Sequence, residues 1–256
     1  MRILLSNDDG YLAKGLLELY LSLSEIAEVA VFAPSHNQSG TSNSLTLQRP
    51  LTIHKIDDGP QNGFYVIDGT PTDCVHIALT GYLGYIPDMV VSGINQGQNM
   101  AEDVIYSGTV AAAVEGYFFG LPSIAFSQLE RGWDNIEDTA LIARQFVQHT
   151  ANNPSPHPVL WNVNIPNISY ENHKGFKLTR LGKRHVSQNV VKAKNPRGED
   201  IYWIGAAGIP KDVSDDTDFY AAKHNFTSVT PLQLDLTNYD AIQQSWIHNC
   251  IPKPIK

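Results

Sequence analysis

A stretch near the start of the chain, RILLSNDDG (residues 2–10), decides the fold. Its apolar half shows no polar alternation, which is typical of a strand buried on both faces. Its polar half has the composition of a tight turn. Leucines at helical spacing follow at 13–24, and a second strand is predicted at 28–33. This order of strand, turn, helix and strand predicts a parallel βαβ unit.

The alternation continues over the first two-thirds of the chain. Further strands are predicted at 49–56, 64–67, 88–92, 123–127 and 159–164, and further helices at 72–83, 109–119 and 136–150. Because the strands are continuously apolar, we expect an α/β fold with a mostly parallel sheet that helices cover on both faces.

The pattern changes after about residue 170. Turns separate strand-like segments at 176–181, 201–205, 219–224 and 227–230, which predicts hairpins that project from the core. A terminal helix is predicted at 238–249, with Ile242, Trp246 and Ile247 on one side. The expected organisation is one domain over residues 1–256, with a core at about 1–184, an extension at about 185–230 and the helix at about 238–249.

The composition narrows the class of protein. The chain has 42% apolar residues and a formal net charge of −8, so we expect a globular protein with no nucleic-acid duplex as its partner. Two cysteines are too few for a disulfide framework. Acidic residues precede any signal-peptide core, and no run of roughly 18 apolar residues occurs. A cytoplasmic protein without a membrane partner is therefore predicted.

Asp8 and Asp9 are the first candidates for chemistry, because they follow the first strand directly. Ligands of open α/β sheets bind beyond the carboxyl ends of the strands. Two adjacent carboxylates repel each other unless they share a cation, and oxygen ligands of this kind favour Mg²⁺ or Mn²⁺ over zinc. The alternative is a turn without a metal, since Asn-Asp-Asp-Gly also suits a turn.

Two later loops have similar positions. The segment 88–97 (DMVVSGINQG) contains Asn95, whose amide can meet a cation or a phosphate. The segment 106–109 (YSGT) begins a helix, where Ser107 or Thr109 can cap and Gly108 allows close approach to an anion. Each is also compatible with an ordinary turn or helix start.

Two other polar segments are weaker candidates. The loop 35–44 (SHNQSGTSNS) follows the second strand and can close over a ligand or be simply solvated. The segment 69–73 (GTPTD) resembles a helix N-terminus, and a structural role is the better interpretation.

Several enzyme classes lack their signature here. The chain contains no Gly-x-x-x-x-Gly-Lys-Ser/Thr loop and no Gly-x-Gly-x-x-Gly after the first strand. It also has no Asp-x-Asp at the first strand and no Gly-x-Ser-x-Gly elbow. The histidines are scattered without convincing zinc spacing.

Taken in order, these motifs resemble the SurE family, the stationary-phase survival proteins that act as 5′-nucleotidases. They are SNDDG (6–10), NQSG (37–40), GTPTDC (69–74), SGINQG (92–97) and YSGTVAAA (106–113), with NVNIP (162–166), TRLG (179–182) and TPL (230–232) also matching. The resemblance covers nearly the whole chain.

The resemblance implies a Rossmann-like three-layer core with a projecting β-hairpin, and a homodimer or homotetramer assembled through the hairpin and the C-terminal region. It implies one divalent cation per subunit, Mg²⁺ or Mn²⁺, held by Asp8, Asp9, Ser39 and Asn95. Phosphate would meet Asn95, Ser107, Gly108 and Thr109, with Gly40 beside them. The implied reaction is hydrolysis of nucleoside 5′-monophosphates, extended to 3′-monophosphates and short polyphosphate.

The alternative function is a non-catalytic nucleotide-binding or sensor protein on the same fold. Binding alone does not need adjacent carboxylates, which repel a phosphate unless a metal intervenes, so the pair favours the enzyme. Asp8 or Asp9 can act as a base or as a nucleophile, and the sequence leaves these roles open.

Overall fold

The computed structural model describes residues 1–244, and its centre is a nine-stranded sheet. The strands are β1 (Arg2–Ser6), β2 (Glu28–Pro34), β3 (Ile53–Lys55), β4 (Tyr65–Ile67), β5 (Met89–Gln96), β6 (Ser123–Gln128), β7 (Leu160–Ile165), β8 (Phe176–Leu178), β9 (Lys183–Arg184), β10 (Val191–Lys194), β11 (Asp200–Trp203), β12 (Pro210–Asp212) and β13 (Thr227–Leu232). The α-helices are α1 (Lys14–Ser24), α2 (Pro71–Ile77), α3 (Gly108–Phe118), α4 (Ile136–Asn152), α5 (Asp218–Lys223) and α6 (Tyr239–Ile242), and the short helical turns are η1 (Ala78–Tyr82), η2 (Ala101–Ile105) and η3 (Tyr170–Asn172).

The sheet has the order β3-β4-β2-β1-β5-β6-β7-β13-β8. The six adjacent strands β4, β2, β1, β5, β6 and β7 are parallel to one another, whereas β3 runs antiparallel to β4 and β13 runs antiparallel to β7. The chain builds outward from β1 in one direction and then from β5 in the other. This reversal between β1 and β5 is the switch point at which open α/β sheets bind ligands.

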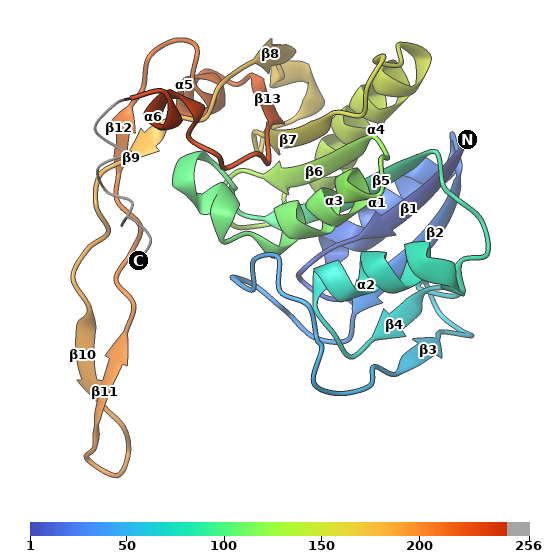
Figure 1. Ribbon diagram of the computed structural model, residues 1–256, viewed down its shortest axis with the longest axis horizontal. Helices are drawn as coiled ribbons and strands as arrows, with labels where there is room; N and C mark the ends of the chain where they lie inside the picture. Colours follow the sequence, from blue (N-terminus) through green and yellow to red (C-terminus); the bar gives the residue numbers. More distant parts are fainter. Residues whose placement is uncertain (245–256) are drawn as a thin grey trace, which may run out of the picture.

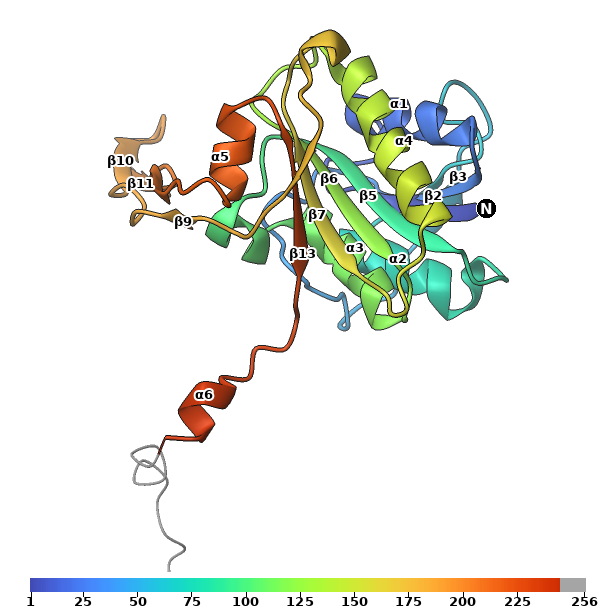
Figure 2. The ribbon, with the colours of Figure 1, turned by 90° about the horizontal axis from the view of Figure 1, so that it is seen from above.

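Helices cover both faces of the sheet, which confirms the predicted three-layer α/β fold (Figure 2). On one face α1 and α4 pack together over Ile3 and Leu5, and on the other α2 and α3 pack over Leu4. Successive residues of β1 therefore point to opposite layers, as the period of a strand requires. The apolar positions of α4 recur every three or four residues, which aims one side of that helix at the core.

Two segments near the end of the core differ from the sequence prediction. The predicted strand 219–224 is wrong, because these residues lie in α5, whose first turn is capped by the Thr217 side chain accepting from the backbone N–H of Tyr220. The predicted strand 227–230 exists as β13, but it lies in the main sheet between β7 and β8 rather than in a projecting hairpin. The core therefore includes residues beyond 184.

The predicted helix 72–83 is α-helical only through α2. The chain continues in the wider turn η1, where Gly81 adopts a φ of 135°, which is costly for residues other than glycine. The sheet order is unaffected.

A long hairpin leaves the body, as predicted, and we call residues 185–209 the arm (Figure 1). At its root β9 pairs with β12, and towards its tip β10 pairs with β11, both antiparallel. Large apolar side chains of the arm are exposed, among them Tyr202, Trp203 and Ile204, the last 97% exposed. Beyond β13 the chain forms α6, which ends at Ile242. Residues 245–249 of the predicted helix 238–249, with Trp246 and Ile247, lie outside the described residues.

Within residues 1–244, no helix combines the length and the apolar character needed to span a membrane.

The layered core makes a prediction about stability. Phe126 of β6 is fully buried between layers, so Phe126→Ala should lower the free energy of unfolding by about 3–5 kcal/mol in urea titration. Phe118→Ala, at a position 66% exposed near the end of α3, should change it by less than about 0.5 kcal/mol. Equal losses in the two variants would contradict the described packing.

Candidate functional site

The predicted site residues gather at the switch point between β1 and β5. Ser6 is opposite Ser92 in the register of these strands, so the loops that follow them leave the same edge of the sheet. Asp8 and Asp9 lie in the loop after β1, and Asn95 lies at the end of β5. The end of β5 therefore adjoins the carboxylate pair.

Asp8 is the buried member of the carboxylate pair. Its Oδ1 accepts a hydrogen bond from Thr109 Oγ1 at 2.5 Å, and only 4% of the residue is exposed. Burial raises the pKa of Asp8 to about 6, an effect that the Thr109 hydrogen bond opposes and the charge of Asp9 reinforces. The carboxylate therefore lies where negative charge is unfavourable without a cation.

Asp9 is less buried, and both of its oxygens have donors. The backbone N–H of Gln96 donates to Oδ2 at 3.2 Å, and Asn37 Nδ2 donates to Oδ1 at 3.1 Å. Burial raises the pKa of Asp9, against the effect of these hydrogen bonds. The ion pairs with Lys, Arg or His found in residues 1–244 all involve other carboxylates.

The start of α3 lies directly against Asp8. Ser107 is the N-cap, and its Oγ accepts from the backbone N–H of Val110 at 3.1 Å. A Cβ on Gly108 would lie 2.8 Å from Asp8 Cβ and 3.2 Å from Thr41 Oγ1, so only glycine fits. The N-terminus of this helix, which favours anions, therefore adjoins the carboxylate pair.

The loop after β2 brings the remaining predicted residues to the same place. The backbone N–H of Gln38 donates to the Asp8 carbonyl at 2.7 Å, and Asn37 orients Ser39 by accepting from its N–H at 2.9 Å. Ser39 and Gly40 are exposed beyond these contacts. Farther along, Ser42 Oγ donates to the Ile105 carbonyl at 2.8 Å, which ties the loop to the segment before α3.

Asn95 contributes the last predicted oxygen. Its Nδ2 donates to the Gly97 carbonyl at 2.8 Å, which leaves the amide oxygen of Asn95 as the atom that can meet a cation. The donors together are two carboxylates with neutral hydroxyl and amide oxygens. No group of three His, Cys, Asp or Glu side chains suited to a metal occurs in residues 1–244. This oxygen set fits a hard cation such as Mg²⁺ or Mn²⁺.

Sequence reasoning missed two residues that hold Asp9, Asn37 and Gln96. Asn37 lies in NQSG (37–40) and Gln96 in SGINQG (92–97), but the sequence does not indicate that the Asn37 side chain or the Gln96 backbone N–H donates to Asp9. Thr109, expected to meet phosphate, donates its hydroxyl to Asp8. Thr70 has the structural role expected for its segment, because it forms a reciprocal cap with Asp73 at the start of α2.

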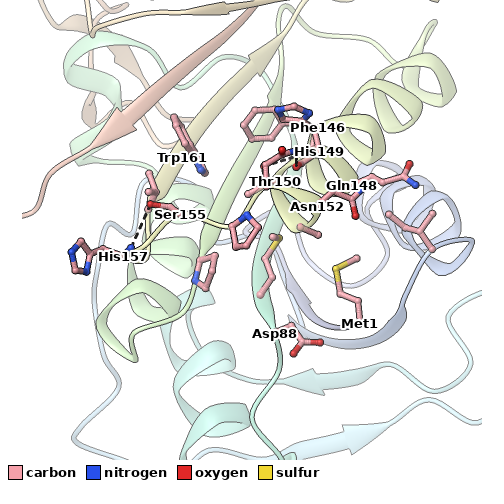
Figure 3. A pocket seen from close by; sticks show the side chains of 17 residues that line it. Met1, Asp88, Phe146, Gln148, His149, Thr150, Asn152, Ser155, His157 and Trp161 are labelled. Atoms are coloured by element: carbon pink, nitrogen blue, oxygen red, sulfur yellow. Dashed lines mark hydrogen bonds between the residues drawn. The ribbon is translucent and has the colours of Figure 1, made fainter.

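A surface pocket of about 740 Å³ lies at the opposite edge of the sheet (Figure 3). Its lining combines the end of α4 with the residues that begin β5, β6 and β7, and includes Asp88, His149, His157 and Trp161. None of the predicted site residues lines it, and it lies at the amino ends of the parallel strands, away from the usual position of ligands. The carboxylate pair remains the better candidate.

Comparison with known proteins agrees with this assignment. The family model "Survival protein SurE" matches residues 3–188, which contain every predicted site residue. The crystal structure of the SurE protein from Aquifex aeolicus is 42% identical in sequence to this chain, with a TM-score of 0.85. The match covers 97% of this chain and 100% of that one. On both grounds this chain belongs to the SurE family.

Proposed function

We propose that the chain is a divalent-metal-dependent phosphatase that hydrolyses nucleoside 5′-monophosphates, and also 3′-monophosphates and short polyphosphate. Asp8, Asp9, Ser39 and Asn95 would hold one Mg²⁺ or Mn²⁺ per subunit. Asn95, Gly40 and the helix start Ser107-Gly108-Thr109 would receive the phosphate. Membership of the SurE family, whose members are metal-dependent nucleotidases and phosphatases, supports the reaction class.

One observation carries the proposal: the Asp8 carboxylate lies against the N-terminus of α3. A helix N-terminus attracts a phosphate, whereas a carboxylate repels it. Both can serve one ligand only if a cation lies between carboxylate and phosphate. A bound divalent cation would polarise the phosphoryl oxygens and lower the pKa of a water.

The two carboxylates have different surroundings, which suggests different roles. Both oxygens of Asp9 have donors, from Asn37 and Gln96, so this side chain is fixed in place. Thr109 fixes Oδ1 of Asp8 by a hydrogen bond. Oδ2 of Asp8 lies 3.1 Å from the position that a Cβ on residue 108 would occupy. Asp8 Oδ2 therefore faces the helix start, where it can orient an attacking water or accept its proton.

Transition-state charge would be stabilised by the chain's own donors. The N-terminal backbone N–H groups of α3 and the Ser107 hydroxyl are fixed before substrate binds, because the helix is capped and packed against Asp8. Donors fixed in this way need little reorganisation during reaction. A protein that only binds nucleotides is the competing function, and phosphate release with and without Mn²⁺ or Mg²⁺ distinguishes the two.

We further propose that the chain is a homodimer or homotetramer assembled through the arm and the C-terminal region. A two-stranded ribbon such as β10 and β11 is only marginally stable in water by itself. The exposed side chains of Trp203 and Ile204 would stabilise it only if they were buried against another surface. Exchange of a hairpin between identical subunits provides such burial at low cost.

We predict that Asp8→Asn or Asp9→Asn lowers turnover by at least about 10²-fold, because each removes a ligand and a candidate base. A carboxyl whose folded-state pKa is raised to about 6 stabilises the fold only at low pH, and that contribution is lost as the pH rises through 6. Without cation at pH 7.5, Asp8→Asn should therefore keep or increase the urea midpoint. Phosphate release and urea titration check the two effects.

The matched control is Asp57→Asn, because Asp57-Asp58-Gly59 repeats the Asp-Asp-Gly sequence at an exposed turn. Its turnover should equal that of the wild type. Chelator should silence the wild type, and added Mn²⁺ or Mg²⁺ should restore it. Full turnover in excess chelator would refute the metal proposal.

We predict that Ser107→Ala weakens the binding of inorganic phosphate and of substrate together. One lost hydrogen bond to a charged group is worth roughly 1.5–3 kcal/mol, or about one to two decades in affinity. Thr70→Ala removes the cap of α2 instead and should leave phosphate binding unchanged, as should Ser187→Ala in the arm. Phosphate inhibition constants that do not differ between the three variants would show that the helix start binds no phosphate.

Shortening the arm tests the assembly. Replacing residues 189–205 by a short Gly-Ser linker keeps the β9–β12 pair and should reduce the mass in light scattering to that of the monomer. A shortened chain that keeps the wild-type mass would place the interface elsewhere.

A further inference from the structure

Asp218 is a buried carboxylate outside the site. It begins α5, none of its surface is exposed, and it accepts hydrogen bonds from three backbone N–H groups. Ala101 donates to Oδ2 at 2.8 Å, and Gly182 and Phe219 donate to Oδ1 at 2.9 and 2.8 Å. These donors belong to three segments: the start of η2, the chain leading into the arm, and α5 itself.

The bond to Ala101 fixes an unusual backbone conformation. Ala101 has a φ of 52°, a left-handed value that costs a non-glycine residue about 1 kcal/mol or more. Met100, Ala101 and Phe219 also share a small apolar cluster with Leu129, which packs the same corner. The start of η2 is therefore held by a specific acceptor and not by its own preference.

The middle of η2 is tied to the arm root as well. Arg184 makes a bidentate ion pair with Asp103, and its backbone N–H donates to Glu102 Oε2 at 3.0 Å. The Arg184 guanidinium also lies over the Phe219 ring, 4.9 Å from the ring centroid. Arm root, α5 and η2 thus meet at one joint, which we call the Asp218 joint.

The position of η2 determines where α3 begins. Only Tyr106 separates the end of η2 from the N-cap Ser107, and the Ile105 carbonyl also accepts from Ser42 of the loop beside the carboxylate pair. A shift of η2 would move both the helix start and that loop.

We propose that Asp218 is a positioning residue that holds η2, and through it the Ser107–Thr109 helix start, in the arrangement that binds phosphate. The inference rests on the proposed phosphatase function for its kinetic readout. Because Gly182 leads into β9, the same carboxylate also links phosphate binding to the placement of the arm root.

Asp218→Asn is the direct test. Asparagine has one acceptor oxygen, and its NH₂ group would face a backbone N–H, so the bond to Ala101 or to Gly182 is lost. We expect inorganic phosphate to inhibit about 10-fold more weakly and KM for a nucleoside monophosphate to rise similarly, with a smaller change in kcat. Asp216→Asn, two residues earlier and exposed in an ion pair with Arg180, should behave as wild type.

A rescue experiment separates positioning from a general loss of stability. Glycine adopts the φ of residue 101 without strain, so Ala101→Gly added to Asp218→Asn should recover part of the phosphate affinity. Amide exchange without substrate should be faster at residues 101–108 in Asp218→Asn and near wild type in the double variant. A folded Asp218→Asn with wild-type phosphate inhibition and wild-type exchange there would overturn the proposal.

Two further outcomes remain decisive. If Asp218→Asn does not fold, Asp103→Asn weakens the same joint from the η2 side, and an unchanged phosphate inhibition constant in that folded variant would overturn the proposal. If the wild type releases no phosphate with Mn²⁺ or Mg²⁺, the proposed function fails, whereas amide exchange at 101–108 still tests the joint itself.

Discussion

The close approach of α3 to Asp8 is the constraint on which the rest of the structure depends. Gly108 leaves no room for a side chain there, and farther along the helix a Cβ on Gly116 would lie 2.5 Å from Val90 Cγ2. Residues 111–113 between them are alanines and are buried. A helix with larger side chains on this surface would stand farther from the sheet, and its N-terminus would no longer reach the carboxylate.

The buried polar side chains beside the carboxylate pair lower the stability of the fold. Within the described residues, Ser6 Oγ, Asn7 Oδ1 and Ser92 Oγ are buried without a hydrogen-bond partner. Apolar side chains at these three positions would remove that desolvation cost. Local departures of this kind from the most stable choice are characteristic of functional sites.

The strand ends were readable in the sequence, because continuous apolar runs followed by polar turns specify a buried parallel sheet without any knowledge of its partners. The same reasoning placed the carboxylates and the Ser107 helix start at one edge. It failed at α5, where aromatic residues suggested a strand and the cap at Thr217 was overlooked. It also missed Asp218, since the polar segment 214–218 reads as a solvated turn and two of the three donors to Asp218, Ala101 and Gly182, are more than 30 residues away in the sequence.

The strand β13 shows a different limit. Nothing in its residues distinguishes a hairpin strand from one that pairs with β7, about 65 residues earlier, because pairing between distant strands depends on the whole sheet. Long-range register was therefore beyond the sequence, whereas local element type mostly was not.

The arm leaves and rejoins the body at one place, the β9–β12 pair. Since no other strand of the body is continuous with it, residues can be gained or lost along the arm without altering the register of the main sheet. The outer part of the arm is thus free to diverge among relatives, with new lengths and new partners, while the body that carries the carboxylates stays the same. Under the proposed assembly, changes confined to the arm would alter the contact between subunits and leave the candidate site as it is.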